Sequence, residues 1–332
     1  MGKLKSIEIC AGAGGQALGL ELAGFDHHLL VEIDKEACNT LRLNRQYWRV
    51  IEQDVRTFNY NEDVQIDLLA GGVPCPPFSI AGNQNGKDDD RDLFPEMIRL
   101  AESIKPRAIL IENVKGILSK KFDLYREHIE DQFEELGYKG KWKLLYSSHY
   151  GVSQLRPRAV FVAFVDDLID YFDWPMNITN PLTVGQLLYG EMSSLGWKGV
   201  KEWKETANRI APTLVGGSKK HGGPDLGPTR ARNEWKKLGV NGSSLAEFPP
   251  ENNFIGLPRL TNKMAALLQG FPDFWKFSGK KTNVYRQIGN AFPPPVAQAI
   301  GLKIKDAINK KRKNKWQYKR GKVLELNFEN IS

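Results

Sequence analysis

The sequence predicts an α/β protein with a doubly wound, mostly parallel sheet and a second, smaller domain rich in loops. Short β-branched runs alternate with helical patterns through the first half of the chain, and a glycine-rich turn follows the first run. Near residue 170 the periodicity fades and Gly, Pro, Asn, Lys and Trp become frequent. Alternation of strands and helices is typical of βαβ units, which join parallel strands through helices.

The first half of the chain alternates runs expected as buried strands with amphipathic helices. The expected strands cover residues 6–10, 29–33, 66–70, 108–112, 144–148 and 160–165. The expected helices cover residues 16–23, 35–45, 93–104 and 122–136. In the third helix, Leu93, Met97 and Ala101 fall on one face at helical spacing. These elements predict the sheet and its flanking helices.

The rest of the chain predicts a second unit and a return to helix. From residue 171 to about 258 we expect loops and short strands, with glycines and cations alternating within residues 213–217, 219–223 and 227–232. Helical periodicity returns at residues 260–269 and again from 296 to about 308.

The composition is that of an ordinary globular protein. Of the 332 residues, 41% are hydrophobic and 26% charged, and no run approaches the ~20 apolar residues that cross a bilayer. The first five residues lack the layout of a signal peptide, so we expect a cytoplasmic protein without membrane contact. The net charge of +8 is compatible with a polyanionic partner. The basic end of the chain fits either a solvated tail or a phosphate-contacting arm.

Three cysteines, Cys10, Cys38 and Cys75, occur at wide spacing. An odd count without close pairs argues against a disulfide framework. No Cys/His cluster has the spacing of zinc ligands, so no metal is expected. Cys38 lies on a predicted helix face and is interpreted as a small buried hydrophobe.

A glycine-rich turn, residues 11–17 (AGAGGQA), joins the first strand to the first helix. Glycines let the backbone approach a ligand, and the helix N-terminus supplies free amides. Glu32, at the end of the next strand, is a candidate acceptor for ribose hydroxyls. Asp54 is a candidate partner for an adenine amino group, or else a helix cap. The turn alone fits a nicotinamide cofactor, S-adenosylmethionine or no ligand.

The third expected strand ends in residues 71–79 (GGVPCPPFS). Ligands of open α/β sheets bind beyond the carboxyl ends of the strands, which places Cys75 at the active edge. Prolines on both sides of Cys75 stiffen the loop. A free thiol is only about 3% thiolate at neutral pH, so a nucleophilic Cys75 needs local activation. Lys87 and Arg91, in the polar loop that follows, are candidate phosphate contacts.

Two later segments place charged groups near the same edge. The strand at residues 108–112 ends in Glu112, where a carboxylate could bind or protonate a heterocycle, or cap the following turn. Gln154, Arg156 and Arg158 alternate along an extended segment and so share one side. Three such donors fit a phosphate or a base edge, or a solvated surface.

Taken together and in this order, these segments resemble the DNA cytosine-5 methyltransferase family of bacterial restriction-modification systems. The segments that carry the resemblance are residues 9–15 (ICAGAGG), 74–79 (PCPPFS), 112–114 (ENV), 154–158 (QLRPR), 259–261 (RLT), 269–272 (QGFP) and 287–294 (QIGNAFPP). Each is weak or moderate alone, and the ordered set is very specific. Only residues 171–256 or so lack a counterpart.

The resemblance implies a covalent mechanism. Cys75 would attack carbon 6 of a cytosine, and Glu112 would bind its ring nitrogen 3 and amino group. Arg156 and Arg158 would hold the cytosine and organise the site. Carbon 5 would then take a methyl group from S-adenosyl-L-methionine, leaving S-adenosyl-L-homocysteine. The target carbon is inaccessible in a duplex, which implies base flipping.

The resemblance also implies cofactor and DNA contacts. The cofactor would be lined by Cys10, Gly12, Gly14, Glu32, Ile33, Asp54, Pro74 and Asn290. Double-stranded DNA would be contacted by Ser79, Lys87, Arg91, Gln154, Lys219, Lys220, Arg230 and Arg232. A catalytic domain would cover residues 1–170, completed by residues 284–332, with a target-recognition domain at 171–283. A restriction endonuclease acting on the same site is the expected partner.

Two positions depart from the family pattern, and three other interpretations stay open. Cys10 stands where phenylalanine is usual, and Pro76 stands where glutamine is common. A tRNA cytosine methyltransferase would share the mechanism, and a non-catalytic DNA-binding relative would share the fold. A nicotinamide dehydrogenase would explain the glycine turn and none of the later motifs.

Overall fold

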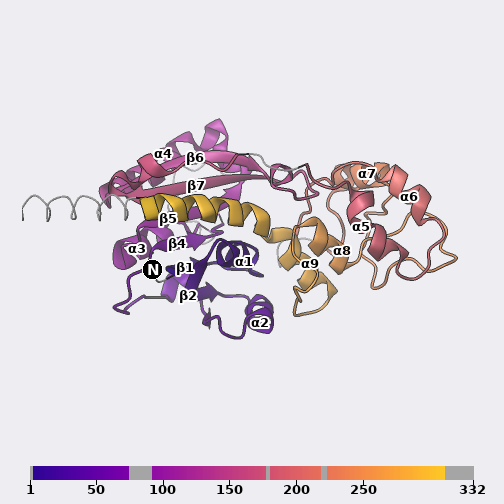
Figure 1. The fold of residues 1–332 in the computed structure, drawn as a ribbon, viewed down its shortest axis with the longest axis horizontal. Coiled ribbons are helices and arrows are strands. Elements are labelled where there is room, and N and C mark those ends of the chain that lie inside the picture. Colours follow the sequence, from indigo (N-terminus) through magenta and orange to yellow (C-terminus); the bar gives the residue numbers. More distant parts are fainter. Residues whose placement is uncertain (1–2, 75–91, 177–179, 218–222, 311–332) are drawn as a thin grey trace, which may run out of the picture.

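The structure is a computed structural model that describes residues 3–74, 92–176, 180–217 and 223–310 (Figure 1). In these residues a seven-stranded sheet has the order β3-β2-β1-β4-β5-β7-β6. Its strands are β1 (Leu4–Ile9), β2 (Phe25–Glu32), β3 (Val50–Glu52), β4 (Leu68–Gly71), β5 (Ala108–Val114), β6 (Tyr138–Tyr146) and β7 (Pro157–Val165). Strands β1 to β5 pair in parallel, whereas β7 is antiparallel to β5 and β6.

Helices cover both faces of the sheet, because its central strands are apolar on both sides. The helices of this lobe are α1 (Gly15–Leu22), α2 (Lys35–Asn44), α3 (Phe94–Ile104) and α4 (Asp123–Glu135). In β4, Leu68 packs in a core with residues of α1 and of the helix at residues 294–310, while Leu69 packs in a second core with residues of α3 and α4. The predicted doubly wound, mostly parallel sheet is confirmed.

The expectation of short strands beyond residue 171 was wrong. The smaller lobe contains the helices α5 (Val184–Ser193), α6 (Val200–Thr206), α7 (Thr229–Lys237) and α8 (Asn262–Leu268). The described part of residues 171–283 holds only isolated β-bridges, such as the one between Gly196 and Glu251. Of these, α8 was expected from the helical periodicity at residues 260–269, whereas α5, α6 and α7 fall in the region expected as loops and short strands. Single buried anchors such as Trp203 and Trp235 fix these helices.

Several strands begin earlier than the sequence predicted, and the difference is largest for β6. The strand expected at residues 144–148 runs over Tyr138–Tyr146 in β6. This strand lies at the edge of the sheet, and only two of its nine residues are buried. Its first half therefore contains lysines and lacks the apolar run by which buried strands are recognised.

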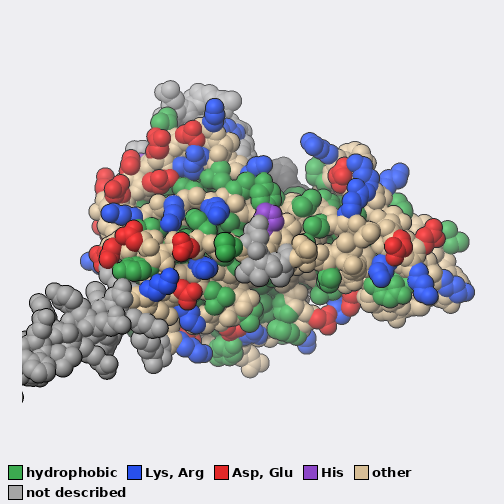
Figure 2. Space-filling model, turned by 45° about the horizontal axis from the view of Figure 1, so that its top comes forward, with side chains coloured by type: hydrophobic (Ala, Val, Ile, Leu, Met, Phe, Trp, Pro, Cys, Tyr) green, Lys and Arg blue, Asp and Glu red, His purple; other side chains and the backbone are tan. Residues whose placement is uncertain are grey.

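Helix α9 (Lys281–Asn290) and the helix at residues 294–310 return from the smaller lobe to the sheet (Figure 1). A continuous core joins the lobes, since it includes Ala17 of α1 and Leu41 of α2 together with Trp235 of α7. Above this junction the surface is notched between the lobes (Figure 2). No helix among the described residues is long and apolar enough to span a membrane.

Candidate active site

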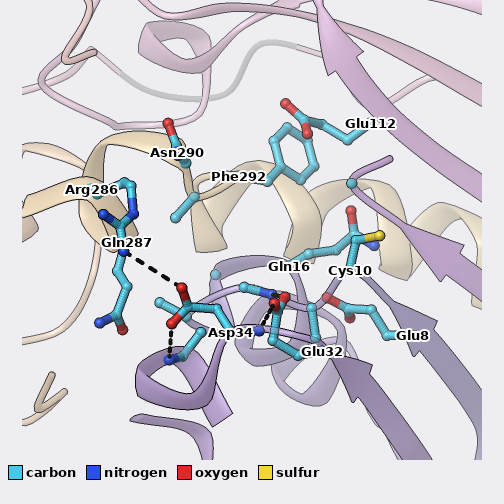
Figure 3. A pocket seen from close by; sticks show the side chains of 17 residues that line it. Glu8, Cys10, Gln16, Glu32, Asp34, Glu112, Arg286, Gln287, Asn290 and Phe292 are labelled. Atoms are coloured by element: carbon cyan, nitrogen blue, oxygen red, sulfur yellow. Dashed lines mark hydrogen bonds and ion pairs between the residues drawn. The ribbon is translucent and has the colours of Figure 1, made fainter. Parts of the chain in front are cut away.

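A cavity of about 280 Å³ opens at the carboxyl edge of the sheet (Figure 3). It lies where β1, β2, β4 and β5 end and where α9 meets the following segment. Its lining residues are Glu8, Cys10, Ala11, Gly12, Ala13, Gly15, Gln16, Glu32, Asp34, Ala37, Gly72, Glu112, Arg286, Gln287, Asn290, Ala291 and Phe292. The described residues hold no cluster of acidic, cysteine and histidine side chains that could bind a metal.

The glycine turn is held open by Glu32. Its carboxylate accepts hydrogen bonds of 2.7 Å from the backbone amides of Gly12 and Asp34. Gly12 has a φ of +53°, and no atom lies within 4 Å of where a Cβ would be, so the turn leaves space on its ligand side. Burial raises the pKa of Glu32, and the hydrogen bonds from the backbone amides only partly oppose that rise. Cys10, Gly12 and Glu32 therefore meet in one wall of the cavity.

Other predicted cofactor residues lie outside the lining. Gly14 has a φ of +83°, and a Cβ there would stand 2.7 Å from Leu41 Cδ2 and 3.0 Å from Trp275; its absence of a side chain serves packing. The Ile33 side chain is 61% exposed. Pro74 is exposed and accepts a 3.4 Å hydrogen bond from the amide of Leu93.

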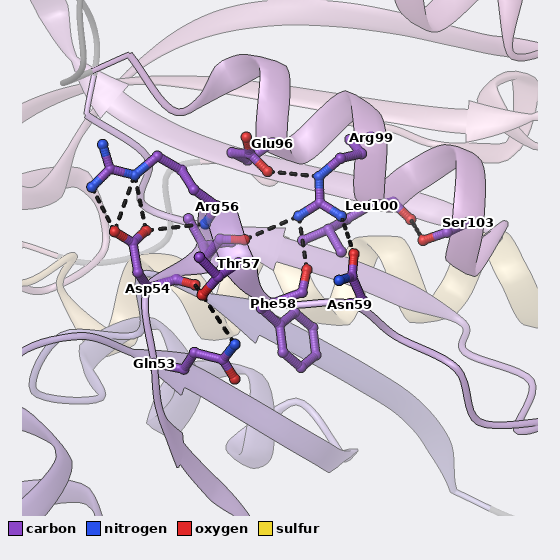
Figure 4. A network of polar contacts seen from close by, with 11 residues as sticks. Gln53, Asp54, Arg56, Thr57, Phe58, Asn59, Glu96, Arg99, Leu100 and Ser103 are labelled. Carbon is purple, nitrogen blue, oxygen red and sulfur yellow. Dashed lines mark hydrogen bonds and ion pairs between the residues drawn. The ribbon is translucent and has the colours of Figure 1, made fainter.

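Asp54 caps a helix. It stands at the N-terminus of a 3₁₀ turn, Val55–Thr57, and accepts from the Arg56 amide at 3.0 Å (Figure 4). The Arg56 guanidinium also pairs with its carboxylate at 2.5 Å. The hydrogen bond from Arg56 is the main reason that the pKa of Asp54 is lowered. The helix-cap alternative therefore describes this residue in the structure.

Glu8 and Gln16 are among the cavity residues that were missed from the sequence. Glu8 lies in β1 and is fully buried, and neither of its carboxylate oxygens has a hydrogen-bond partner among the described residues. Burial, followed by the charge of Glu32, raises the pKa of Glu8 well above its usual value. Gln16, in the first turn of α1, has two unpartnered amide atoms. The sequence feature that could have identified Glu8 is a carboxylate within residues 6–10, which were expected to form a buried strand.

The opposite wall comes from α9. Arg286 lies 3.5 Å from Asp34, the N-cap residue of α2. Asn290, predicted to contact a cofactor, lines the cavity and donates to the Gly217 carbonyl at 3.1 Å. Asp34 and Arg286 lay outside the motifs used for prediction, and only the fold brings them to the pocket.

Glu112 lies on the cavity at the end of β5. Its Oε1 is 2.6 Å from Arg158 Nε, and both side chains are nearly buried. Burial raises the pKa of Glu112, while Arg158 opposes that rise. The next residue, Asn113, donates to the Val73 carbonyl at 2.8 Å, which ties β5 to the segment leading to residue 75. Cys75 itself lies outside the described residues, as do Ser79, Lys87 and Arg91.

The role expected for Arg156 requires correction. Its side chain is fully buried and donates to the carbonyls of Leu214 at 2.8 Å, Gly289 at 2.7 Å and Ala291 at 3.1 Å. A guanidinium enclosed by backbone cannot hold a cytosine. Arg156 instead fastens the segment before β7 to the smaller lobe and to the end of α9.

Gln154 is also corrected. It was expected to contact DNA, but it is fully buried. Its amide nitrogen donates to Leu268 O and to Gln269 Oε1, and its oxygen accepts from the Leu214 amide. Every polar atom of this side chain is used inside the protein, so none is left for DNA.

Of the cations expected to contact DNA, Arg230 and Arg232 are described and Lys219 and Lys220 are not. Both arginines lie on α7, and Arg230 is exposed. Figure 2 shows Lys and Arg side chains on the part of the smaller lobe where Figure 1 places α7, beside the notch. Cys38 is buried, as expected, and its thiol donates to Glu32 O at 3.3 Å.

A mostly parallel sheet with a glycine turn after β1 and a polar pocket at its carboxyl edge is the arrangement in which open α/β proteins bind nucleoside-containing ligands. The C-5 cytosine-specific DNA methylase model matches residues 4–306, and the chain belongs to this family. It is 55% identical over 308 residues to the Type II methyltransferase M.NgoMIV of Neisseria gonorrhoeae, covering 92% of this chain and 98% of that protein. It is 52% identical to M.NaeI of Lentzea aerocolonigenes, covering 93% and 76%.

Solved structures agree on the fold. Entamoeba histolytica methyltransferase EhMeth superposes with a TM-score of 0.66 at 15% identity, covering 93% of this chain and 99% of that one. Schizosaccharomyces pombe Dnmt2 superposes with a TM-score of 0.60 at 18% identity, covering 90% and 97%. At these identities the likeness concerns the fold alone.

The chain is thus a C-5 cytosine DNA methyltransferase of restriction-modification type, as the ordered motifs predicted. The family membership sets aside the dehydrogenase, the tRNA enzyme and the non-catalytic relative as interpretations. S-adenosylmethionine is the methyl donor of the family.

Proposed function

We propose that this chain methylates carbon 5 of a cytosine flipped out of a short, specific double-stranded DNA sequence, with Cys75 as the nucleophile. The observation that carries the proposal is the shared cavity. Glu112, held by Arg158, opens onto the same space as Glu32 and the glycine turn. A base bound by Glu112 would therefore lie next to a ligand bound by the turn.

The cavity fits S-adenosylmethionine. Glu32 retains lone pairs for ribose hydroxyls beyond those used by Gly12 and Asp34. Cys10, Gly12 and Asn290 would complete the walls around it. When bound, this group supplies an activated methyl group. The fully buried and unpartnered Glu8 carboxylate indicates that a polar ligand belongs here.

Glu112 is suited to bind cytosine in its neutral form. A protonated carboxyl group offers one O–H donor and one acceptor oxygen. Cytosine presents the matching pair, with nitrogen 3 as acceptor and the amino group as donor. Burial raises the pKa of Glu112 and so favours this neutral form. Arg158 fixes the carboxyl group in place from the other side.

The proposed reaction passes through a covalent bond between Cys75 and the cytosine. The Cys75 thiolate forms a bond to carbon 6, and nitrogen 3 takes the proton of Glu112. Carbon 5 then accepts the methyl group. A solvent water then accepts the proton on carbon 5, and the electron pair of that C–H bond restores the 5,6 double bond and expels the Cys75 thiolate. Nitrogen 3 returns its proton to Glu112. Arg158 positions Glu112, while Arg156 holds the surrounding backbone.

We assign the smaller lobe, residues 171–283, to target recognition, and residues 1–170 with 284–332 to catalysis. Arg230 and Arg232 would contact DNA lying in the notch between the lobes, together with Lys219, Lys220, Ser79, Lys87 and Arg91 from outside the described residues. Arginine suits guanine edges and lysine suits phosphates. A restriction endonuclease that cuts the same unmethylated site would be the partner in the cytoplasm.

Trapping tests the nucleophile. DNA with 5-fluorocytosine at the target position should form a denaturation-resistant adduct, because fluorine at carbon 5 blocks the final elimination. Cys75→Ala should form none and should still bind DNA. The absence of an adduct with wild-type protein under turnover conditions would exclude Cys75 from this role.

A further inference from the structure

Gln16 is a buried polar side chain that the protein leaves without a hydrogen bond. It lies in the first turn of α1, is 4% exposed and lines the cavity. Neither its amide nitrogen nor its amide oxygen has a partner among the described residues. A buried amide without partners is costly, so an uncompensated one at a cavity indicates a ligand.

Other buried glutamines of the fold are satisfied. Gln287 lines the same cavity, but its oxygen accepts from Thr40 Oγ1 at 2.6 Å and its nitrogen donates to Ser278 O at 2.8 Å. Gln154 is saturated as well. The open amide of Gln16 is therefore a local feature of the pocket.

Gln16 lies next to a second open group. In Figure 3 the side chains of Gln16 and Glu8 lie near Cys10, on the side of the pocket away from Arg286. The carboxylate of Glu8 can only accept hydrogen bonds, whereas the amide of Gln16 can donate two. An acceptor and a donor side by side match a group that carries both an ammonium and a carboxylate.

The other lining side chains with N–H groups each have a contact within the protein. Arg286 faces Asp34, the Gln287 amide is occupied, and Asn290 donates to Gly217 O. Among the lining side chains that carry N–H groups and are described, Gln16 is thus the one for which no contact within the protein is seen.

We propose that Gln16 Nε2 donates a hydrogen bond to the carboxylate at the amino-acid end of S-adenosylmethionine, with Glu8 beside its ammonium. The proposal rests on the assignment of this cavity to that cofactor. Gln16 is then a binding residue that orients the amino-acid end while Glu32 holds the ribose.

Calorimetric titrations of the full-length chain with three ligands distinguish the contact to the carboxylate from the contact to the ammonium. S-adenosylhomocysteine carries both charged groups, its decarboxylated analogue keeps the amine alone, and 5′-methylthioadenosine lacks both. Gln16→Met should weaken S-adenosylhomocysteine binding by about 10- to 100-fold, the size of one hydrogen bond to a charged group. Binding of the other two ligands should stay near the wild-type level.

Two variants serve as comparisons. Glu8→Gln should weaken both amine-bearing ligands and spare 5′-methylthioadenosine. Gln287→Met removes an amide from the same cavity that already has partners, and it should leave the ratio between the three affinities unchanged. Retained binding of 5′-methylthioadenosine shows that each variant is folded.

Equal loss of all three ligands in Gln16→Met, or no loss of any, would overturn the proposal. Equal loss would mean that Gln16 shapes the pocket without touching the carboxylate. Failure of the wild-type protein to bind any of the three ligands would instead contradict the proposed function itself.

Discussion

Glu8 and Glu112 are both buried at the cavity, and they differ in what faces them. Glu112 has Arg158 at 2.6 Å, while Glu8 has no partner among the described residues. Burial raises the pKa of both carboxyl groups. Glu112 already faces a positive charge in the free protein, whereas Glu8 is suited to a positive charge that arrives with a ligand.

Glu112→Gln tests whether Glu112 transfers a proton to nitrogen 3 of the cytosine. Glutamine keeps a donor and an acceptor in the same plane, so binding of the flipped cytosine should persist. It cannot transfer a proton, so the single-turnover methylation rate should fall by about 10²- to 10⁴-fold. DNA affinity, measured in parallel, should change little. An unchanged rate would remove Glu112 from the proton transfer.

Glu8→Gln should stabilise the cofactor-free protein at high pH. The folded state raises the pKa of Glu8 above 4.5, so it holds the proton more tightly than the unfolded chain does. The stability from this proton is complete below pH 4.5 and is lost as pH rises toward the raised pKa. Glutamine cannot ionise and avoids that loss.

Thermal melting of both proteins gives the comparison. The melting temperatures should agree near pH 4, and the variant should melt about 2–5 °C higher at pH 8. A variant that melts lower than wild type at pH 8 would mean that the Glu8 carboxylate is satisfied in the free protein.

Helix α7 combines a buried anchor with an exposed polar face. Trp235 is fully buried, whereas Arg230 and Asn233 are exposed. Arginine and asparagine are the side chains that pair with guanine and adenine in the major groove. A short helix pinned at one residue can present such a face rigidly to DNA.

Arg230→Ala should weaken binding to the specific duplex by about 5- to 150-fold, the range of one base contact. Binding to unrelated DNA should fall much less. Lys139→Ala removes an exposed cation from β6, away from the notch, and should change neither affinity. Equal losses on both duplexes for Arg230→Ala would assign Arg230 to phosphate instead. Fluorescence anisotropy at fixed salt measures all of these affinities.

The segment around Arg156 joins the lobes through backbone carbonyls. Arg156→Lys keeps the charge but cannot reach Leu214, Gly289 and Ala291 together. We expect a loss of about 2–4 kcal/mol in the free energy of unfolding, together with faster amide exchange at residues 214–217 and 289–291. Arg99→Lys, which loses bonds to Val55 O and Phe58 O within one lobe, should not speed exchange there. Unchanged exchange in Arg156→Lys would contradict the bridging role.

Most of the sheet was predictable because its central strands are apolar runs that can be recognised from the sequence alone. Glu32 and Glu112 were predictable as pocket residues for a related reason, since each ends a strand at the carboxyl edge. Helices α5, α6 and α7 of the smaller lobe were not predictable, because they are fixed by anchors such as Trp203 that pack against residues far away in the sequence.

Burial explains the site residues that the sequence misassigned. Alternation placed Gln154, Arg156 and Arg158 on one side of the chain, but it could not show that the smaller lobe covers the first two. Asp54 shows a related limit, because its role as a cap and its pairing with Arg56 are visible only in the structure. Partners brought in by tertiary structure decide between a ligand contact and a structural one.

The proposed sites of the two substrates are one cavity and one notch. The cavity at the sheet edge lies where the lobes meet, since Asn290 of α9 contacts Gly217 of the smaller lobe. The helix at residues 294–310 packs in the same core as α1, which follows the glycine turn. The last part of the described chain therefore supports the first, and the smaller lobe is inserted between them.

Methylation in cells tests the central claim most directly. The chain would be expressed in a bacterial host without cytosine methylation, and the genome sequenced by a conversion method that detects 5-methylcytosine, with Cys75→Ala as the control. We expect one short recurring motif to be methylated with the intact chain and no motif with Cys75→Ala. An unmethylated genome from soluble, folded protein, or the same motif with both chains, would contradict the account.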